Sequence, residues 1–185
     1  MRKRGQAPWR QAGSGTLVRL AHTRAKTTMK AIFLDIDGVI ATRDSMIASF
    51  DRDLEPHEIE YDRRSLMYLG CIVKQTGAIV VLSSSWRADL NSGSAFIEAI
   101  VNNLLDQLSA AGAPISDATP MIGGTDRSYE IGAWLDEHPC EAYVIIDDRA
   151  RFELRPEVAD GHLVLIEDSN GIRASHVAQA LRILR

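Results

Sequence analysis

The chain lacks the features of a disulfide scaffold, a zinc protein or a membrane protein. Its two cysteines, Cys71 and Cys140, are far apart and match no metal-ligand spacing. No apolar run approaches the roughly 18 residues that a membrane-spanning helix needs. Apolar residues make up 45% of the chain and charged residues 25%, which is ordinary for a soluble globular protein. We therefore expect a reducing, cytoplasmic location without membrane contact, and Cys71 as a small core residue.

Acidic residues are absent from positions 1–28. That segment has seven basic residues, which leaves 14 basic residues against 25 acidic ones in residues 29–185. Without sustained periodicity it is expected to be a disordered basic extension, preceding one domain over residues 29–185. Three interpretations are open: an upstream start before Met29, an arm in weak contact with nucleic acid, or an organelle-targeting peptide.

From residue 30 onward, short apolar runs alternate with stretches of helical spacing. Continuous, β-branched runs predict buried strands over residues 31–34, 78–82, 143–146 and 162–166. Apolar spacing predicts helices over residues 62–77, 94–112, 128–137 and 173–184. A further short strand is expected near Met121 and Ile122. The alternation indicates an α/β fold with a mainly parallel sheet and helices on both faces.

Residues 39–61 are acidic and carry little apolar surface, and no domain-sized insert follows Ser83. We expect this stretch to be a loop or flap, so the domain should have a minimal cap or none. A site without a lid encloses a small metabolite poorly but admits a phosphate carried on a large molecule.

Carboxylates and hydroxyls follow three predicted strands, at the edge where parallel α/β sheets bind ligands. They are Asp35, Asp37 and Gly38 after the first strand, Ser83 to Arg87 after the second, and Asp147 and Asp148 after the third. Side chains two positions apart point the same way, so Asp35 and Asp37 should face one spot. Converging carboxylates repel unless a cation lies between them, and hard oxygen ligands suit Mg²⁺. The predicted Mg²⁺ ligands are Asp35, Asp37, Asp147 and Asp148.

These segments resemble three motifs of the haloacid dehalogenase (HAD) superfamily of phosphotransferases. DIDGV ends the first strand, SSSWR follows the second and DD follows the YVII strand, in the family's order over about residues 29–185. The resemblance implies a Rossmann-like three-layer α/β/α sandwich and phosphoryl transfer through an aspartyl-phosphate. On this basis Asp35 matches the nucleophile, and Asp37 matches the acid that protonates the leaving oxygen and then activates water. Ser83 matches the hydroxyl that holds the phosphoryl group, and the DD pair matches the acidic metal-binding motif.

The family's usual lysine between the second and fourth motifs is missing, because no lysine follows Lys74. Arg127 is the expected substitute, since it begins a helix whose positive end favours phosphate and since arginine grips two oxygens at once. Arg87 is the competing candidate. Gly38, which permits a turn without crowding the phosphate, and Ser84 are also expected to contact the substrate.

Within the superfamily, DIDGVI, SSSWR and an arginine followed by EI and WL are similar to the small capless HAD proteins of Swiss army knife RNA repair systems. The similarity implies nucleotide or polynucleotide phosphate ends as substrates, although the acidic residues 29–185 argue against a long phosphate-tracking groove. Trp86 can stack on a base, but a core position is the more common one. Arginines that follow the strand ends can bind substrate or form surface salt bridges; they are Arg87, Arg149, Arg151 and Arg155.

Two other functional classes remain as alternatives. A phospho-acceptor receiver domain also has an acidic pair, but there the pair ends the first strand and the acceptor comes later, which is the reverse of the order here. A catalytically silent HAD-like binding protein would lack an essential group, and only the lysine is missing. The sequence therefore predicts a Mg²⁺-dependent phosphoric monoester hydrolase acting on a phosphorylated small molecule or a nucleic-acid end.

Overall fold

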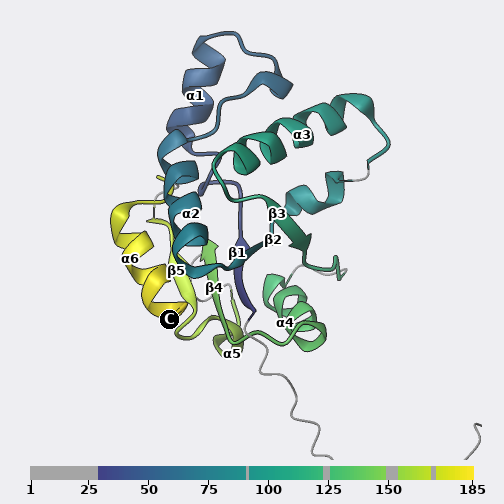
Figure 1. Cartoon of the computed structure of the whole chain (residues 1–185). Helices are drawn as coiled ribbons and strands as arrows, with labels where there is room; N and C mark the ends of the chain where they lie inside the picture. The colour runs from purple at the N-terminus through teal and green to yellow at the C-terminus, as the bar shows by residue number, and fades with distance from the viewer. Residues whose placement is uncertain (1–28, 91, 123–125, 149–153, 168–169) are drawn as a thin grey trace, which may run out of the picture.

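A computed structural model of the chain describes residues 29–90, 92–122, 126–148, 154–167 and 170–185. The basic segment 1–28, Arg149 and Arg151 lie outside the described residues. Five parallel strands form one sheet in the order β3-β2-β1-β4-β5 (Figure 1). The strands are β1 (Lys30–Leu34), β2 (Ile79–Leu82), β3 (Ile115–Ala118), β4 (Ala142–Asp147) and β5 (Leu163–Leu165).

The four predicted helices are present, and a side-chain cap explains where two of them begin. The Asp62 carboxylate accepts a hydrogen bond from the amide of Ser65 at 2.8 Å, and Asp126 caps α4 in the same way. None of the described helices is long and apolar enough to span a membrane. The helices are α1 (Arg43–Asp51), α2 (Arg63–Thr76), α3 (Ala95–Ala110), α4 (Arg127–Glu137), α5 (Pro156–Ala159) and α6 (Ala174–Ile183), with 3-10 turns η1 (Pro56–Glu58) and η2 (Ser85–Asp89).

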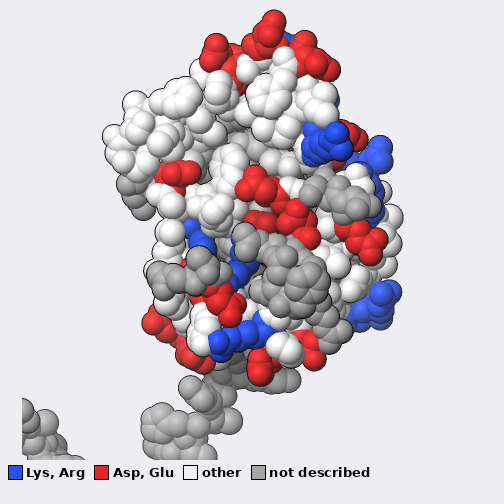
Figure 2. All heavy atoms as spheres, turned by 180° about the vertical axis from the view of Figure 1, so that it is seen from behind, with Lys and Arg blue, Asp and Glu red and all other residues white. Residues whose placement is uncertain are grey.

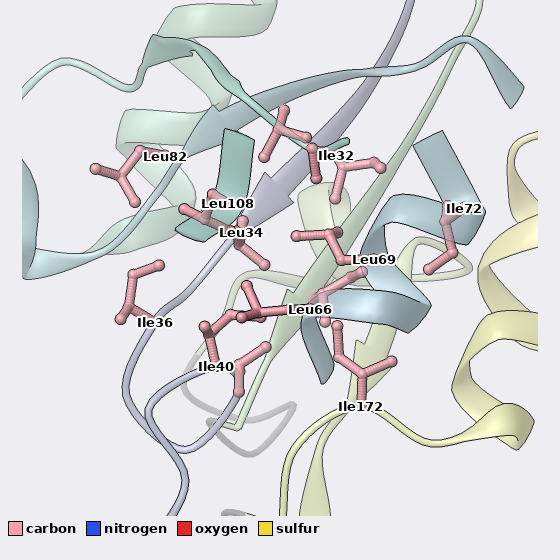
Figure 3. Packing of buried hydrophobic residues seen from close by; sticks show 14 of the residues in the cluster. Ile32, Leu34, Ile36, Ile40, Leu66, Leu69, Ile72, Leu82, Leu108 and Ile172 are labelled. Atoms are coloured by element: carbon pink, nitrogen blue, oxygen red, sulfur yellow. The ribbon is translucent and has the colours of Figure 1, made fainter. Parts of the chain in front are cut away.

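Side-chain alternation along β1 produces the three layers. Ile32 and Leu34 point to one face, where they pack against Leu69 of α2 and Leu108 of α3 (Figure 3). Ala31 and Phe33 point to the other face, where α4 contributes Ile131 and Trp134 and α5 contributes Ala159. Because both faces of the sheet are covered, its strands are continuous apolar runs, as the sequence indicates.

The order of connections places a ligand-binding crevice between β1 and β4. The chain moves outward from β1 to β2 and β3, and then returns to β4 on the other side of β1. The first connections run through α2 and α3 on one face, and the later ones through α4 and α5 on the other. Ligands of open α/β sheets bind outside the carboxyl ends of the strands at such a reversal.

Two expectations about local structure are wrong, and the predicted flap contains a helix that was not expected. The additional strand is β3, at Ile115–Ala118. Met121 and Ile122 are exposed and lie outside it. The acidic stretch after Gly38 is not a simple loop: it contains α1, capped by Thr42, and η1, although it remains too short for a domain. Cys71 is exposed, because the apolar stripe of α2 places it on the outer face of that helix.

Candidate active site

The strand register brings the ends of β1, β2 and β4 to one level. The amide of Asp35 donates to the carbonyl of Ile146 at 3.0 Å, and the amide of Ser83 donates to the carbonyl of Leu34 at 2.9 Å. Asp35, Ser83 and Asp147 therefore emerge side by side at the carboxyl edge of the sheet. Backbone pairing, rather than any local motif, sets the spacing between these side chains.

Among the described residues, Asp35, Asp147 and Asp148 form a group in which one carboxylate oxygen from each residue lies within 4.8 Å of the other two. Asp35 is 4% exposed and Asp147 is 1% exposed. Carboxylates so close and so poorly hydrated repel strongly unless a cation compensates them. Hard oxygen donors at this density fit Mg²⁺.

Arg127 supplies a cation of the protein itself to this group. Its guanidinium contacts the Asp35 carboxylate at 3.0 Å and also the Asp147 carboxylate. Arg127 is only 7% exposed, and it begins α4, whose start is fixed by the Asp126 cap. Arg127, which the sequence favoured over Arg87, is therefore the arginine that contacts these carboxylates.

Two buried serine hydroxyls follow β2, which ends beside β1 at the same edge of the sheet. Ser83 and Ser84 are 1% and 0% exposed, and their Oγ atoms have no hydrogen-bond partner among the described residues. A buried hydroxyl without a partner costs about 1–3 kcal/mol, so these groups suit an oxygen-rich ligand such as a phosphoryl group. Gly38 has a φ of 74°, which confirms that the turn after β1 needs a glycine.

The side chain of Asp37 does not belong to the group of three carboxylates. It lies exposed at the rim, where Nε1 of Trp86 donates to both of its oxygens, at 3.3 and 3.2 Å. Partial burial raises the pKa of Asp37, and the charges of Asp35 and Asp148 raise it further, against the lowering effects of Trp86 and Arg127. A raised pKa favours the protonated form, which is the form that can donate a proton.

Arg87 is held away from the carboxylate group by a buried ion pair. Its guanidinium donates to Glu130 Oε2 at 2.6 Å and also contacts the Thr119 hydroxyl, and both members of the ion pair are under 10% exposed. For Arg155 the sequence left substrate binding and a surface salt bridge open. In the structure Arg155 forms a salt bridge with Asp126, at 3.0 Å. The structure therefore brings Arg127, and not Arg87, to the carboxylates.

Residues 31–177 match the family described as the HAD domain in Swiss Army Knife RNA repair proteins. The chain belongs to this HAD family. The matched range contains the segments DIDGV, SSSWR and DD. These findings confirm the resemblance seen in the motifs that end β1, β2 and β4.

A solved structure shares the fold of this HAD domain. It is the D,D-heptose 1.7-bisphosphate phosphatase from B. bronchiseptica, crystallised with magnesium and phosphate. The TM-score is 0.53 at 14% sequence identity, over 85% of this chain and 98% of that chain. The likeness confirms the Rossmann-like α/β architecture. Comparison with curated proteins gave no match.

Sequence reasoning missed two contacts of the HAD site. The bond from Trp86 to Asp37 joins two motifs 49 positions apart, and the only signal was that Trp86 directly follows the serines. Glu130, the partner of Arg87, lies on the helix that carries Arg127, and no local pattern links it to the site. Both contacts depend on the packing of different elements, which periodicity does not describe.

Proposed function

We propose that this HAD domain hydrolyses phosphoric monoesters through an aspartyl-phosphate on Asp35, and that it acts on phosphate ends of nucleotides or polynucleotides. The observation that carries the proposal is the convergence of Asp35, Asp147 and Asp148 next to the unpartnered hydroxyl of Ser83. Carboxylates alone would repel a phosphate, so the site makes chemical sense only as one that holds a metal and a phosphoryl group together.

In the first step, an Asp35 carboxylate oxygen attacks phosphorus and the bond from phosphorus to the leaving oxygen breaks. Asp37 gives its proton to that oxygen, so the alcohol departs neutral. Arg127 and Ser83 bind oxygens of the phosphoryl group as it transfers, in the role of fixed donors. The raised pKa of Asp37 supports its assignment as the acid.

In the second step, the Asp37 carboxylate takes a proton from water and the hydroxide attacks phosphorus. The bond between phosphorus and Asp35 breaks, inorganic phosphate leaves, and both aspartates return to their starting protonation states. The sum is one ester and one water converted to one alcohol and one phosphate.

We assign the metal to Asp35, Asp147 and Asp148. Mg²⁺ bound there supplies charge neutralisation between the nucleophile and the phosphate oxygens. Asp37 was also expected as a ligand, but its carboxylate faces Trp86, so we assign it to proton transfer. Gly38 and Ser84 are proposed to border the phosphate, and Arg87 is proposed to be structural.

The flap formed by α1 and η1 supports terminal phosphates as substrates. It lies between β1 and α2, it is too small to enclose a metabolite, and its outer end is acidic (Figure 2). The exposed acids there are Asp51, Asp53, Glu55 and Glu58. A nucleic-acid backbone would avoid such a surface, whereas a single end can reach the site beside it. The family's description also points to RNA repair, and the basic residues of 1–28 offer weak further contact.

The proposal is tested by measuring phosphate release from three kinds of substrate: 3′- and 5′-phosphorylated oligonucleotides, nucleoside monophosphates and sugar phosphates. We expect kcat/KM to be highest for an oligonucleotide end, intermediate for mononucleotides and lowest for sugar phosphates. Asp35→Asn should abolish turnover without unfolding the chain, while Asp106→Asn, on the exposed face of α3, should behave as wild type.

Each outcome addresses a different part of the proposal. Turnover by Asp35→Asn, or full activity in excess EDTA, would contradict the mechanism. A free sugar phosphate that wins by about tenfold or more would contradict the substrate class. Stable phosphorylation without turnover would indicate a receiver-like module, and binding without either would indicate a silent protein.

A further inference from the structure

Among the described side chains, only that of Trp86 hydrogen-bonds to the carboxylate of Asp37. The two distances, 3.3 and 3.2 Å, are nearly equal, so one N–H is shared between both oxygens. Such a shared bond fixes the plane of a carboxylate while leaving its other lone pairs open. An exposed carboxylate would otherwise sample several rotamers.

The indole is itself held from two sides. Its ring meets the buried ring of Tyr61 edge-on, with centroids 6.3 Å apart and planes at 72°. Trp86 also packs against the main core cluster, so the side chain is half-buried rather than free at the surface. A donor immobilised in this way imposes its geometry on a mobile acceptor, and not the reverse.

The turn that carries Trp86 is anchored at its next residue. In η2, which starts directly after Ser84, Arg87 is tied by its buried ion pair to Glu130 of α4. The same α4 begins with Arg127, which contacts Asp35. The position of the indole is thus linked to the position of the nucleophile through one rigid set of contacts.

We propose that Trp86 is a positioning residue that aims the Asp37 carboxyl at the leaving oxygen of the substrate. This inference rests on the proposed function, in which Asp37 delivers that proton. Trp86 does not touch the reacting atoms and acts only through Asp37. Its position in the SSSWR motif therefore serves proton delivery, in addition to packing.

The dependence of kcat/KM on the leaving group isolates this role. A p-nitrophenolate departs without a proton, whereas an alkyl oxygen needs one. Trp86→Phe should lower kcat/KM by on the order of tenfold or more for the alkyl phosphate that the wild type hydrolyses fastest, because the proton of Asp37 is no longer aimed at the leaving oxygen. It should lower kcat/KM for p-nitrophenyl phosphate by no more than about twofold. Asp37→Asn should show the same selectivity, and Trp86→Phe should add little in the Asp37→Asn background.

Trp134→Phe is the matched control. Its Nε1 also donates to a carboxylate, that of Asp117 at 2.8 Å, but it lies in the cluster on the other face of the sheet. The ratio of the two kcat/KM values should be that of the wild type. If Trp86→Phe does not fold, 3-(3-benzothienyl)alanine at position 86 keeps the bicyclic shape and removes only the N–H.

The outcomes separate this inference from the function on which it rests. An equal loss for both esters, or no loss, in Trp86→Phe would overturn the positioning role while leaving the phosphatase intact. Failure of the wild type to hydrolyse any phosphate ester would overturn the proposed function and, with it, the role of Trp86.

Discussion

Arg127 shows how much a single residue decides in this site. It is a buried cation between carboxylates from two strands. Removing one member of such a set leaves the others charged and unpaired, which costs more than the pair contributes. Its effect should therefore appear in both catalysis and stability.

Arg127→Ala should reduce transition-state stabilisation by about 2–4 kcal/mol, by analogy with the loss of one oxyanion donor. Arg127→Lys should recover part of this, because it restores the charge but not the two-oxygen grip. The measurement is kcat/KM for phosphate release at saturating Mg²⁺. Arg87→Ala is the contrasting variant: because it leaves its partner Glu130 buried and unpaired, it should lower the unfolding midpoint, and it should lower kcat/KM by less than Arg127→Ala does. Wild-type kinetics in Arg127→Ala would remove the clamp from the mechanism.

At the scale of elements, α2 and α3 approach each other most closely at a glycine. A Cβ built on Gly70 would lie 1.9 Å from the carbonyl oxygen of Ala111, which is backbone and cannot move aside as a side chain can. The absence of a side chain at this position is therefore a packing requirement between helices, and not a turn requirement.

Gly70→Ala should lower the free energy of unfolding by about 1–3 kcal/mol, because the two helices must separate. Gly132→Ala is the matched control on α4: a Cβ there meets nothing within 4 Å, so alanine should raise the free energy of unfolding by up to about 1 kcal/mol. Urea denaturation followed by circular dichroism measures both. A neutral Gly70→Ala would mean that the helices can shift without loss.

At the scale of the whole molecule, the proposed metal site would join the two halves of the sheet. Asp35 follows β1, whereas Asp147 and Asp148 belong to the end of β4, so a cation held by all three would link strands that the chain reaches more than 100 residues apart. Such a cation binds only the folded state, because the unfolded chain does not hold these carboxylates together.

Mg²⁺ should therefore raise the thermal midpoint. At about 100 times the dissociation constant it adds about 2.7 kcal/mol, which for a chain of this size is a rise of roughly 5–10 °C. Asp148→Asn should reduce the shift, while Asp106→Asn should leave it unchanged. Thermal unfolding at graded Mg²⁺ measures this without any substrate. An undiminished shift in Asp148→Asn would remove that residue from the site.

Much of the architecture could be predicted because it depends on local chemistry. β1 is recognisable from its continuous apolar run, and the start and end of α2 from Asp62 and Gly77, since neither signal needs a distant partner. The strand at Ile115–Ala118 could not be predicted in this way, because it is an edge strand with a half-exposed, partly polar sequence. The helix within the flap was missed for a similar reason, because α1 is polar and exposed on most of its surface.

The sequence by itself determined which residues stand at the ends of the elements. Asp35, Ser83 and the Asp147–Asp148 pair stand at the ends of strands, and Arg127 stands at the start of a helix. Tertiary structure alone decided which of them meet. The level register of β1, β2 and β4 placed three of them side by side, and the ion pair with Glu130 took Arg87 away from the site while the Asp126 cap aimed Arg127 into it. The physical reason is range: propensity and capping act within a few residues, whereas burial, charge pairing and strand register depend on segments that are distant along the chain.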